Sequence, residues 1–260
     1  MSRGAVEGTG LKERLRRGEV VLGCFQRIPA PEVTEVCAYA GFDFVVVDTE
    51  HTLVSEERVA DLVRAAEAAG IPPLVRASSH EPAGIARLLE AGPVGLHVPQ
   101  VSSAAEAAAA VRATRFQPHG SRGLATPRRA GYGARMTLEE YVRTSEEELV
   151  LVLQVEDAAG LAEIDAIASL DGVDAVFLGL TDLSQNLGVP GRYDDPALVE
   201  AVERAVEAVR RVGKPVGVPV VDADMARRWL ERGATYLAAN DIRLLLGSAR
   251  EFLARAREPA

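Results

Sequence analysis

Two acidic residues, Glu156 and Asp182, each follow an apolar run of this 260-residue chain. The first run covers residues 149–153 and the second covers residues 175–178, with a helical pattern between them. An order of strand, helix and strand is typical of buried parallel strands, whose carboxyl ends lie at one edge. We therefore expect the two carboxylates to meet, although 182 − 156 = 26 positions separate them. Paired carboxylates suit a hard divalent cation.

A purely structural interpretation fits the same spacing. Asp182 can cap a following helix turn, and Glu156 can lie beside a helix start and favour its dipole. Spacing alone leaves both interpretations open.

Asp48, His51 and Arg76 form a second group whose residue types suit catalysis. Asp48 and His51 follow a predicted strand, and Arg76 ends the next one. An aspartate can hold an imidazole in one tautomer and raise its basicity, as a general base requires. An arginine can clamp a carboxylate or a developing oxyanion. The structural alternatives are a loop salt bridge between Asp48 and His51, and an ion pair of Arg76 with Asp48 or Glu50.

The elements that must position these residues alternate between strands and helices. Apolar runs predict strands at residues 19–25, 43–47, 73–76, 95–99, 149–153, 175–178, 215–220 and 235–239. A short polar helix at residues 10–17 precedes them, and an amphipathic helix at residues 242–256 closes the chain. We predict an α/β fold, a single (β/α)8 TIM barrel over residues 1–260 with a flexible tail at residues 1–9. Residues 115–135 form a long irregular segment, interpreted either as an anion-binding lid or as a solvated basic loop.

In such a barrel the functional rim consists of the residues just after each strand. Topology alone selects Phe25, Gln26, Asp48, Glu50, His51, Arg76, Pro99, Gln100, Gln154, Glu156, Gly179, Thr181, Asp182, Pro219, Ala239 and Asn240. This set was not chosen for its chemistry, yet it gathers acids, a histidine and an arginine on one face. The convergence favours the metal interpretation over the structural one. His97 lies inside a strand and is interpreted as a core or rim histidine without a chemical role.

Composition excludes several classes of protein. The chain has 29 basic and 38 acidic residues, a net charge of −9, which argues against nucleic-acid binding. No apolar run approaches the length of a membrane-spanning helix, and the first residues lack an apolar signal core, so we expect a cytoplasmic protein. Cys24 and Cys37 lack metal-site spacing and are expected to be reduced and buried.

The lysines restrict the chemistry further. The chain has only two, Lys12 and Lys214, and neither is expected at the barrel mouth. An imine with a carbonyl substrate is therefore excluded, and carbonyl chemistry would need a metal or a foreign cofactor.

Residues 41–51 read Gly-Phe-Asp-Phe-Val-Val-Val-Asp-Thr-Glu-His. Further along the chain come Val75-Arg76, Val98-Pro99, Ser121-Arg-Gly123, Gln154-Val-Glu156 and Gly179-x-x-Asp-Leu-Ser184. In order and spacing these segments resemble the HpcH/HpaI aldolases, whose first segment reads Gly-Phe-Asp-(Trp/Phe)…Asp-x-Glu-His. That family comprises the metal-dependent (class II) pyruvate aldolases, including 4-hydroxy-2-oxoheptanedioate aldolase. The resemblance runs from Leu11 to about Leu253.

The resemblance implies a metal site and an assembly. Glu156 and Asp182 would bind Mg2+, Mn2+ or Co2+, with Gln154 beside them. The subunits would form a homohexamer, a dimer of trimers, in which the last helix packs on a neighbouring subunit. That helix carries Leu244, Leu245, Leu246, Phe252 and Leu253, more apolar surface than a lone outer helix needs.

The resemblance also implies roles around the substrate. Arg76 would contact the keto oxygen of pyruvate, and His51, oriented by Asp48, would serve the acid–base step. Gly179 and Thr181 would offer backbone groups to the pyruvate carboxylate. Phe25 falls near the pocket, where relatives often carry tryptophan.

The implied reaction is reversible aldol cleavage of a 4-hydroxy-2-oxo acid into pyruvate and an aldehyde, through a metal-stabilised pyruvate enolate. A decarboxylase or a citrate lyase-like carbon–carbon lyase would use the same site, and a non-catalytic small-acid binding protein is a more remote alternative. The chain departs from the family in reading Gly-Leu-Thr-Asp-Leu-Ser, at residues 179–184, for Gly-Pro-Ala-Asp-Leu-Ser. That departure leaves the shape of the carboxylate cradle unspecified. Further departures at residues 124–131, 218–220 and 239–241, which would line the aldehyde side, leave the aldehyde unspecified.

Overall fold

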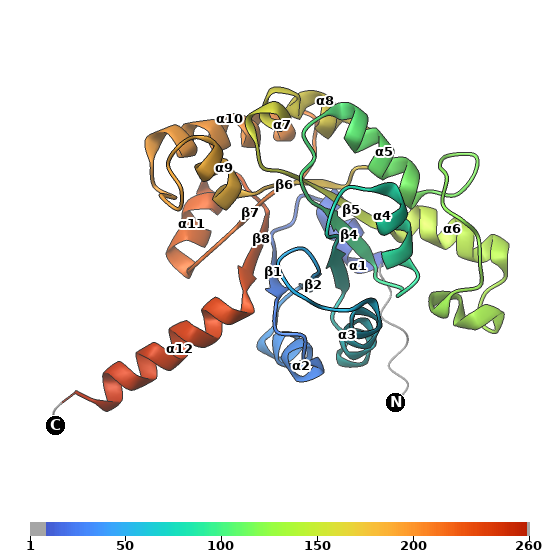
Figure 1. The fold of residues 1–260 in the computed structure, drawn as a ribbon, viewed down its shortest axis with the longest axis horizontal. Coiled ribbons are helices and arrows are strands. Elements are labelled where there is room, and N and C mark those ends of the chain that lie inside the picture. Colours follow the sequence, from blue (N-terminus) through green and yellow to red (C-terminus); the bar gives the residue numbers. More distant parts are fainter. Residues whose placement is uncertain (1–8, 259–260) are drawn as a thin grey trace.

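A parallel sheet closes into a barrel in the computed structural model, which describes residues 9–258 (Figure 1). Its strands are β1 (Val21–Gln26), β2 (Phe44–Asp48), β3 (Pro73–Arg76), β4 (Gly95–Val98), β5 (Val150–Val155), β6 (Ala175–Leu178), β7 (Val216–Pro219) and β8 (Tyr236–Asn240). Each strand pairs with the next one along the chain, and β8 closes on β1. The predicted TIM barrel is confirmed, with strand ends within two residues of those predicted.

Helices alternate with the strands, and most of them cover the outside of this barrel (Figure 1). They are α1 (Thr9–Arg16), α2 (Pro31–Ala40), α3 (Glu56–Ala69), α4 (Pro82–Leu89), α5 (Ala104–Thr114), α6 (Leu138–Glu148), α7 (Ala158–Ala162), α8 (Ile164–Ser169), α9 (Leu180–Asn186), α10 (Pro196–Arg211), α11 (Ala223–Glu231) and α12 (Asp241–Ala256). The helical pattern between β5 and β6 forms two short helices, and α9 was not predicted. The predicted tail lies outside the described residues, apart from Thr9, which begins α1.

Strand side chains alternate between two apolar layers, as the two-residue period of a strand requires. In β2, Phe44 and Val46 belong to the cluster inside the barrel, whereas Val45 and Val47 pack against the outer helices. Leu11 and Leu15 of α1 join the inner cluster. Helix α1 therefore closes the amino-terminal end of the barrel and leaves the carboxyl ends of the strands open.

Both lysines lie far from those carboxyl ends, as predicted. The Lys12 ammonium group is buried, donates to the Leu149 carbonyl at 2.6 Å and lies 3.3 Å from the Asp174 carboxylate. The Lys214 ammonium group donates to the Leu170 carbonyl at 2.5 Å. These partners lie at the starts of β5 and β6, so neither amine faces the barrel mouth. Cys24 and Cys37 are free and buried in one small apolar cluster.

Three of the five arginines of residues 115–135 contradict the interpretation of that segment as a solvated basic loop. Arg115 pairs with Glu146, Arg128 with Glu67 and Arg129 with Glu148, at 2.6–2.9 Å. The last two belong to the 3-10 helix η1 (Arg128–Gly133). Acids of α3 and α6 thus offset these charges and tie the segment to the barrel wall.

Helix α12 extends away from the body of the molecule (Figure 1). Its large apolar side chains are exposed, including Leu245 at 63% and Phe252 at 71%. Among residues 9–258, no helix is both long and apolar enough to cross a membrane.

Candidate active site

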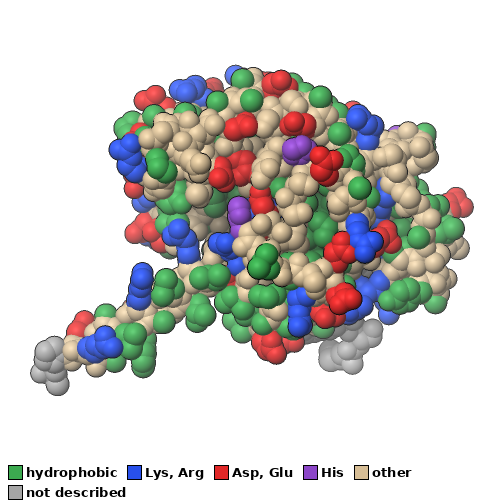
Figure 2. Space-filling view, viewed as in Figure 1, with side chains coloured by type: hydrophobic (Ala, Val, Ile, Leu, Met, Phe, Trp, Pro, Cys, Tyr) green, Lys and Arg blue, Asp and Glu red, His purple; other side chains and the backbone are tan. Residues whose placement is uncertain are grey.

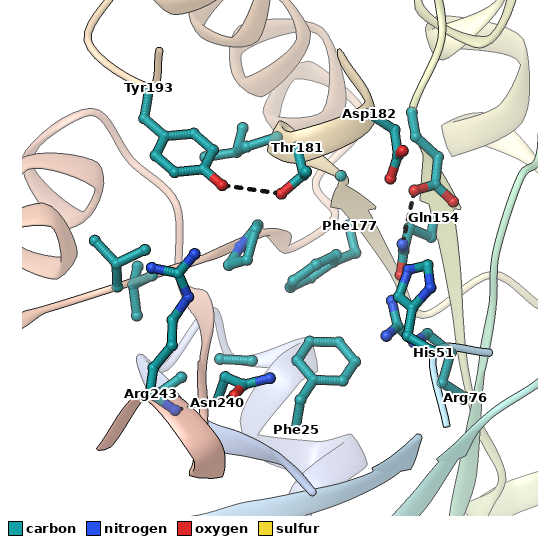
Figure 3. A pocket seen from close by; sticks show the side chains of 18 of the residues that line it. Phe25, His51, Arg76, Gln154, Phe177, Thr181, Asp182, Tyr193, Asn240 and Arg243 are labelled. Carbon is teal, nitrogen blue, oxygen red and sulfur yellow. Dashed lines mark hydrogen bonds between the residues drawn. The ribbon is translucent and has the colours of Figure 1, made fainter. Parts of the chain in front are cut away.

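A cavity of about 370 Å3 opens at the carboxyl ends of the strands, where acidic and histidine side chains gather (Figure 2). Eight of the nine predicted site residues line it: Phe25, His51, Arg76, Gln154, Glu156, Gly179, Thr181 and Asp182. Figure 3 shows His51, Arg76, Gln154 and Asp182 on one side, and Tyr193, Thr181 and Arg243 on the other. Asp48 is fully buried beside Arg76 and does not line the cavity.

Glu156 is held by two donors at the end of β5. Its Oε1 accepts the backbone N–H of Gln100 at 2.8 Å, and its Oε2 accepts the side-chain amide of Gln154 at 2.9 Å. Gln100 adopts the left-handed backbone conformation, with φ of 57°, and it is one of two described non-glycine residues that do so. Gly179 lies against the same carboxylate, since a Cβ there would come within 2.5 Å of Oε2. The position of Glu156 is therefore fixed from three sides.

Glu156 and Asp182 are not compensated by any cation of the described residues. Neither forms an ion pair with a described lysine, arginine or histidine. Burial, followed by repulsion from Glu50 and Asp182, raises the pKa of Glu156 to about 7, against the opposing effect of its hydrogen bonds. Two hard oxygen donors with uncompensated charge fit a divalent cation.

The acid pair does not make a complete metal cage. Within residues 9–258, no group of three or more His, Cys, Asp and Glu side chains converges in a way that could hold a metal ion. Water and substrate oxygens would have to supply the other ligands, as in sites that keep positions open for chemistry.

Arg76 makes the ion pairs that the structural interpretation expected. Its Nε and Nη2 donate to the two Asp48 oxygens at 2.9 and 2.6 Å, and its Nη1 lies 3.1 Å from Glu50. Its guanidinium also lies 4.6 Å from the centre of the Phe25 ring. Burial favours a raised pKa for Asp48, but the hydrogen bonds and charge of Arg76 outweigh it and lower the pKa. Arg76 is thus rigidly held while one edge still faces the cavity.

The predicted contact between Asp48 and the His51 imidazole is wrong. Asp48 instead accepts the backbone N–H groups of Glu50 and His51, at 3.0 and 3.2 Å. Arg76 and these two amides occupy the Asp48 oxygens, which leaves the ring without that partner. The His51 Nε2 lies 3.7 Å from Glu50, and its side chain is exposed at the cavity mouth. Asp48 positions His51 through the backbone of its loop.

The predicted use of the Gly179 backbone also needs correction. The Gly179 N–H donates to Val155 within the sheet, and its carbonyl accepts from Leu183. Both groups are therefore occupied. Gly179 matters at this site because it has no side chain that would collide with Glu156. The Thr181 hydroxyl lies 3.1 Å from the Tyr193 hydroxyl, so this part of the wall also carries side-chain hydrogen-bonding groups.

Three polar or charged residues at the cavity were missed by the sequence prediction. Arg27 donates to the His51 carbonyl at 2.9 Å and lies one position beyond the rim set of β1. Arg243 lies in the first turn of α12, directly after β8, where no loop signals a rim residue. Tyr193 comes from the segment between α9 and α10, and nothing in its local sequence points to the cavity.

Comparisons with known proteins agree with this geometry. Residues 22–241 match the HpcH/HpaI aldolase/citrate lyase family. A pyruvate aldolase of Rhizobium etli is 37% identical over 245 residues, which are 94% of this chain and 96% of that protein. The crystal structure of an HpcH/HpaI aldolase/citrate lyase family protein from Burkholderia cenocepacia is 34% identical, with a TM-score of 0.91 over 96% of this chain and 99% of that one. The chain in a crystal structure of a citrate synthase is 32% identical, with a TM-score of 0.82 over 95% of this chain and 99% of that one.

The barrel, its acid-lined mouth and these relatives define a carbon–carbon lyase of the pyruvate aldolase type. The chain belongs to the HpcH/HpaI aldolase/citrate lyase family.

The raised pKa of Glu156 predicts a pH dependence of stability. Its folded-state pKa is about 7, above the ordinary value of 4.5, so the folded state binds more protons between these values. The free energy of unfolding of the metal-free protein should therefore fall as pH rises through this range. We expect the wild type to lose about 1 kcal/mol more than Glu156→Gln between about pH 6 and pH 8. Urea unfolding in EDTA measures both, and equal pH dependence would contradict the assignment.

Proposed function

We propose that this lyase catalyses reversible aldol cleavage of a 4-hydroxy-2-oxo acid to pyruvate and an aldehyde. The observation that carries the proposal is that the uncompensated carboxylates of Glu156 and Asp182 line the same cavity as Arg76. In this proposal Glu156 and Asp182 hold Mg2+, Mn2+ or Co2+. When bound, the cation supplies electrophilic stabilisation of charge on the keto oxygen.

The protein side chains supply the remaining chemistry. Arg76, fixed by Asp48 and Glu50, directs its remaining N–H edge at the keto oxygen, where negative charge develops as the C3–C4 bond breaks. His51 lies at the open side of the cavity and takes the proton of the 4-hydroxyl group, directly or through a water. The apolar rings of Phe25 and Phe177 line the cavity floor, and Thr181 lies where the pyruvate carboxylate would bind.

A decarboxylase of oxaloacetate-like acids is the runner-up, because it develops the same charge on the same oxygen. A decarboxylase needs no base for a 4-hydroxyl group, so the presence of His51 at the cavity favours the aldolase. A citrate lyase-like reaction is a further alternative.

Exchange of the pyruvate methyl protons in deuterium oxide tests the proposal directly, because exchange requires the same charge on the keto oxygen. With Mg2+ or Mn2+ the wild type should exchange these protons, and EDTA should stop exchange reversibly. The exchange rate should fall at least about 100-fold in Glu156→Gln and in Asp182→Asn, because each change removes one strong electrostatic contact. Proton NMR follows the loss of the methyl signal. Undiminished exchange in a verified metal-free preparation would refute the metal site.

The roles of His51 and Arg76 can be separated by comparing two reactions in one preparation. Arg76→Ala should slow aldol cleavage and oxaloacetate decarboxylation alike, each by roughly 100-fold, because both place charge on the keto oxygen. His51→Ala should slow cleavage far more than decarboxylation, which has no 4-hydroxyl proton to remove. The comparison cancels damage to folding, which matters because Arg76→Ala removes two hydrogen bonds to the buried Asp48 carboxylate. Equal losses in His51→Ala would assign His51 to another role.

We also propose that α12 packs on a neighbouring subunit of a homohexamer, a dimer of trimers. The helix projects from the body, and Ile242, Leu244, Leu245, Leu246, Phe252 and Leu253 are each at least 42% exposed. Leaving this apolar surface in water is costly, and a second copy offers an equal surface. Sedimentation should give an oligomer for the wild type and for the control Arg250→Gln. Leu245→Glu/Phe252→Glu should dissociate it, and a wild-type monomer at micromolar concentration would contradict the proposal.

A further inference from the structure

A thread of polar side chains crosses the otherwise apolar interior of the barrel directly beneath the cavity. It consists of Tyr236 on β8, His97 on β4 and Gln154 on β5, all of them buried. The Tyr236 hydroxyl lies 2.6 Å from His97 Nε2, and the Gln154 amide donates to Glu156 Oε2 at 2.9 Å. The rings of Phe25 and Phe177 pack edge-on against His97, with centroids 5.4 and 5.2 Å away. The thread therefore leads from the barrel interior to a proposed metal ligand.

The protonation of the thread follows from its surroundings. Burial, and then the charge of Arg76, lowers the pKa of His97 to about 3, so the imidazole is neutral. Burial raises the pKa of Tyr236 well above 10, so the phenol keeps its proton. A neutral imidazole carries one N–H and one acceptor nitrogen, and its neighbours decide which nitrogen has the proton.

Glu156 selects one arrangement of the whole thread. Its carboxylate needs a donor from Gln154, so the amide nitrogen faces Glu156 and Gln154 Oε1 faces away from it. Gln154 Oε1 and His97 Nδ1 are both buried and have no hydrogen-bond partner in the described structure, and Gln154 is the neighbouring side chain that raises the pKa of His97. With the proton on Nδ1, the imidazole offers Oε1 the donor that it lacks, and Nε2 accepts from the Tyr236 hydroxyl. This tautomer lets the two unpartnered atoms satisfy each other.

The opposite arrangement is costly at every step. If the proton were on Nε2, Nδ1 would be an acceptor that faces Gln154. The Gln154 side chain would then favour turning its amide N–H groups toward Nδ1. The Gln154 carbonyl would then face Glu156 Oε2 at about hydrogen-bond distance, which places two acceptors against each other. The imidazole tautomer therefore sets which end of the amide meets the carboxylate.

We propose that His97 is a positioning residue for the metal site, acting by holding the Gln154 amide in the orientation that presents its N–H group to Glu156. The inference rests on the proposed role of Glu156 as a ligand. His97 touches neither the substrate nor Glu156, and its effect passes through Gln154. It should therefore change metal affinity much more than the rate of the metal-saturated enzyme.

Mn2+ titrations of the full-length protein, followed by the electron paramagnetic resonance of free Mn2+, test the proposal without relying on activity. His97→Leu and His97→Phe remove the donor while filling the space, and we expect each to raise the Mn2+ Kd about tenfold. His97→Asn is the matched control, because its amide places an N–H group near the position of Nδ1, and its Kd should stay within about threefold of wild type. At saturating Mn2+, the kcat of His97→Leu should return to within about threefold.

The outcomes distinguish this inference from the proposed function. If the wild type does not bind Mn2+, or if Glu156→Gln binds it as tightly as the wild type does, the metal site itself is refuted. Wild-type binding with an unchanged Kd in His97→Leu or His97→Phe would overturn the positioning role. An equal loss in His97→Asn and His97→Leu, with both variants folded by circular dichroism, would also overturn it, since the donor would then be irrelevant. Either donor-free variant suffices if the other does not fold.

Discussion

The distribution of buried negative charge determines how the mouth of this barrel is built. The buried side chains of Asp48, Glu50 and Glu156 gather there beside the exposed Asp182, and burial makes an uncompensated carboxylate costly. Arg76 pairs with both Asp48 and Glu50, and the Arg27 Nε lies 3.5 Å from Asp48. Glu156 and Asp182 have no such partner among the described residues, so the pKa of Glu156 rises. In the proposed metal site, the same imbalance would favour a divalent cation, which would relieve the repulsion and the burial cost together.

The closed parallel sheet makes this concentration of charge possible. All strands end at one edge, so short segments after β2, β3, β5 and β6 deliver side chains to one cavity. Neighbouring strands can bring these groups so close together only where one of the facing residues is a glycine. A Cβ at Gly179 would strike Glu156, and one at Gly217 would come within 2.4 Å of the Tyr236 carbonyl. Glycine at these positions lets Glu156, directly after β5, and the buried Tyr236 on β8 occupy their observed places.

The sequence predicts the barrel well because strand and helix periods repeat along nearly all of it. It also predicts most of the cavity lining, since topology alone assigns the residues after each strand to one face. It fails where several partners compete for one group, as at Asp48, whose oxygens go to Arg76 and two amides rather than to the His51 ring. It also misses Tyr193, because a contact made by a loop between two helices leaves no local pattern. Polar threads such as Tyr236–His97–Gln154 depend on register between strands that are distant in sequence.

The ion pairs of Arg76 with Asp48 and Glu50 are compatible with a catalytic role for the same side chain. A guanidinium has five N–H groups, and the contacts to Asp48 and Glu50 leave part of that set directed at the cavity. The ion pair removes the rotamer freedom that a solvated arginine would lose on binding substrate. Electrostatic stabilisation is most effective when the donor is already in place before charge develops. The buried ion pair with Asp48 is thus the physical reason why Arg76 can act on a substrate oxygen at low reorganisation cost.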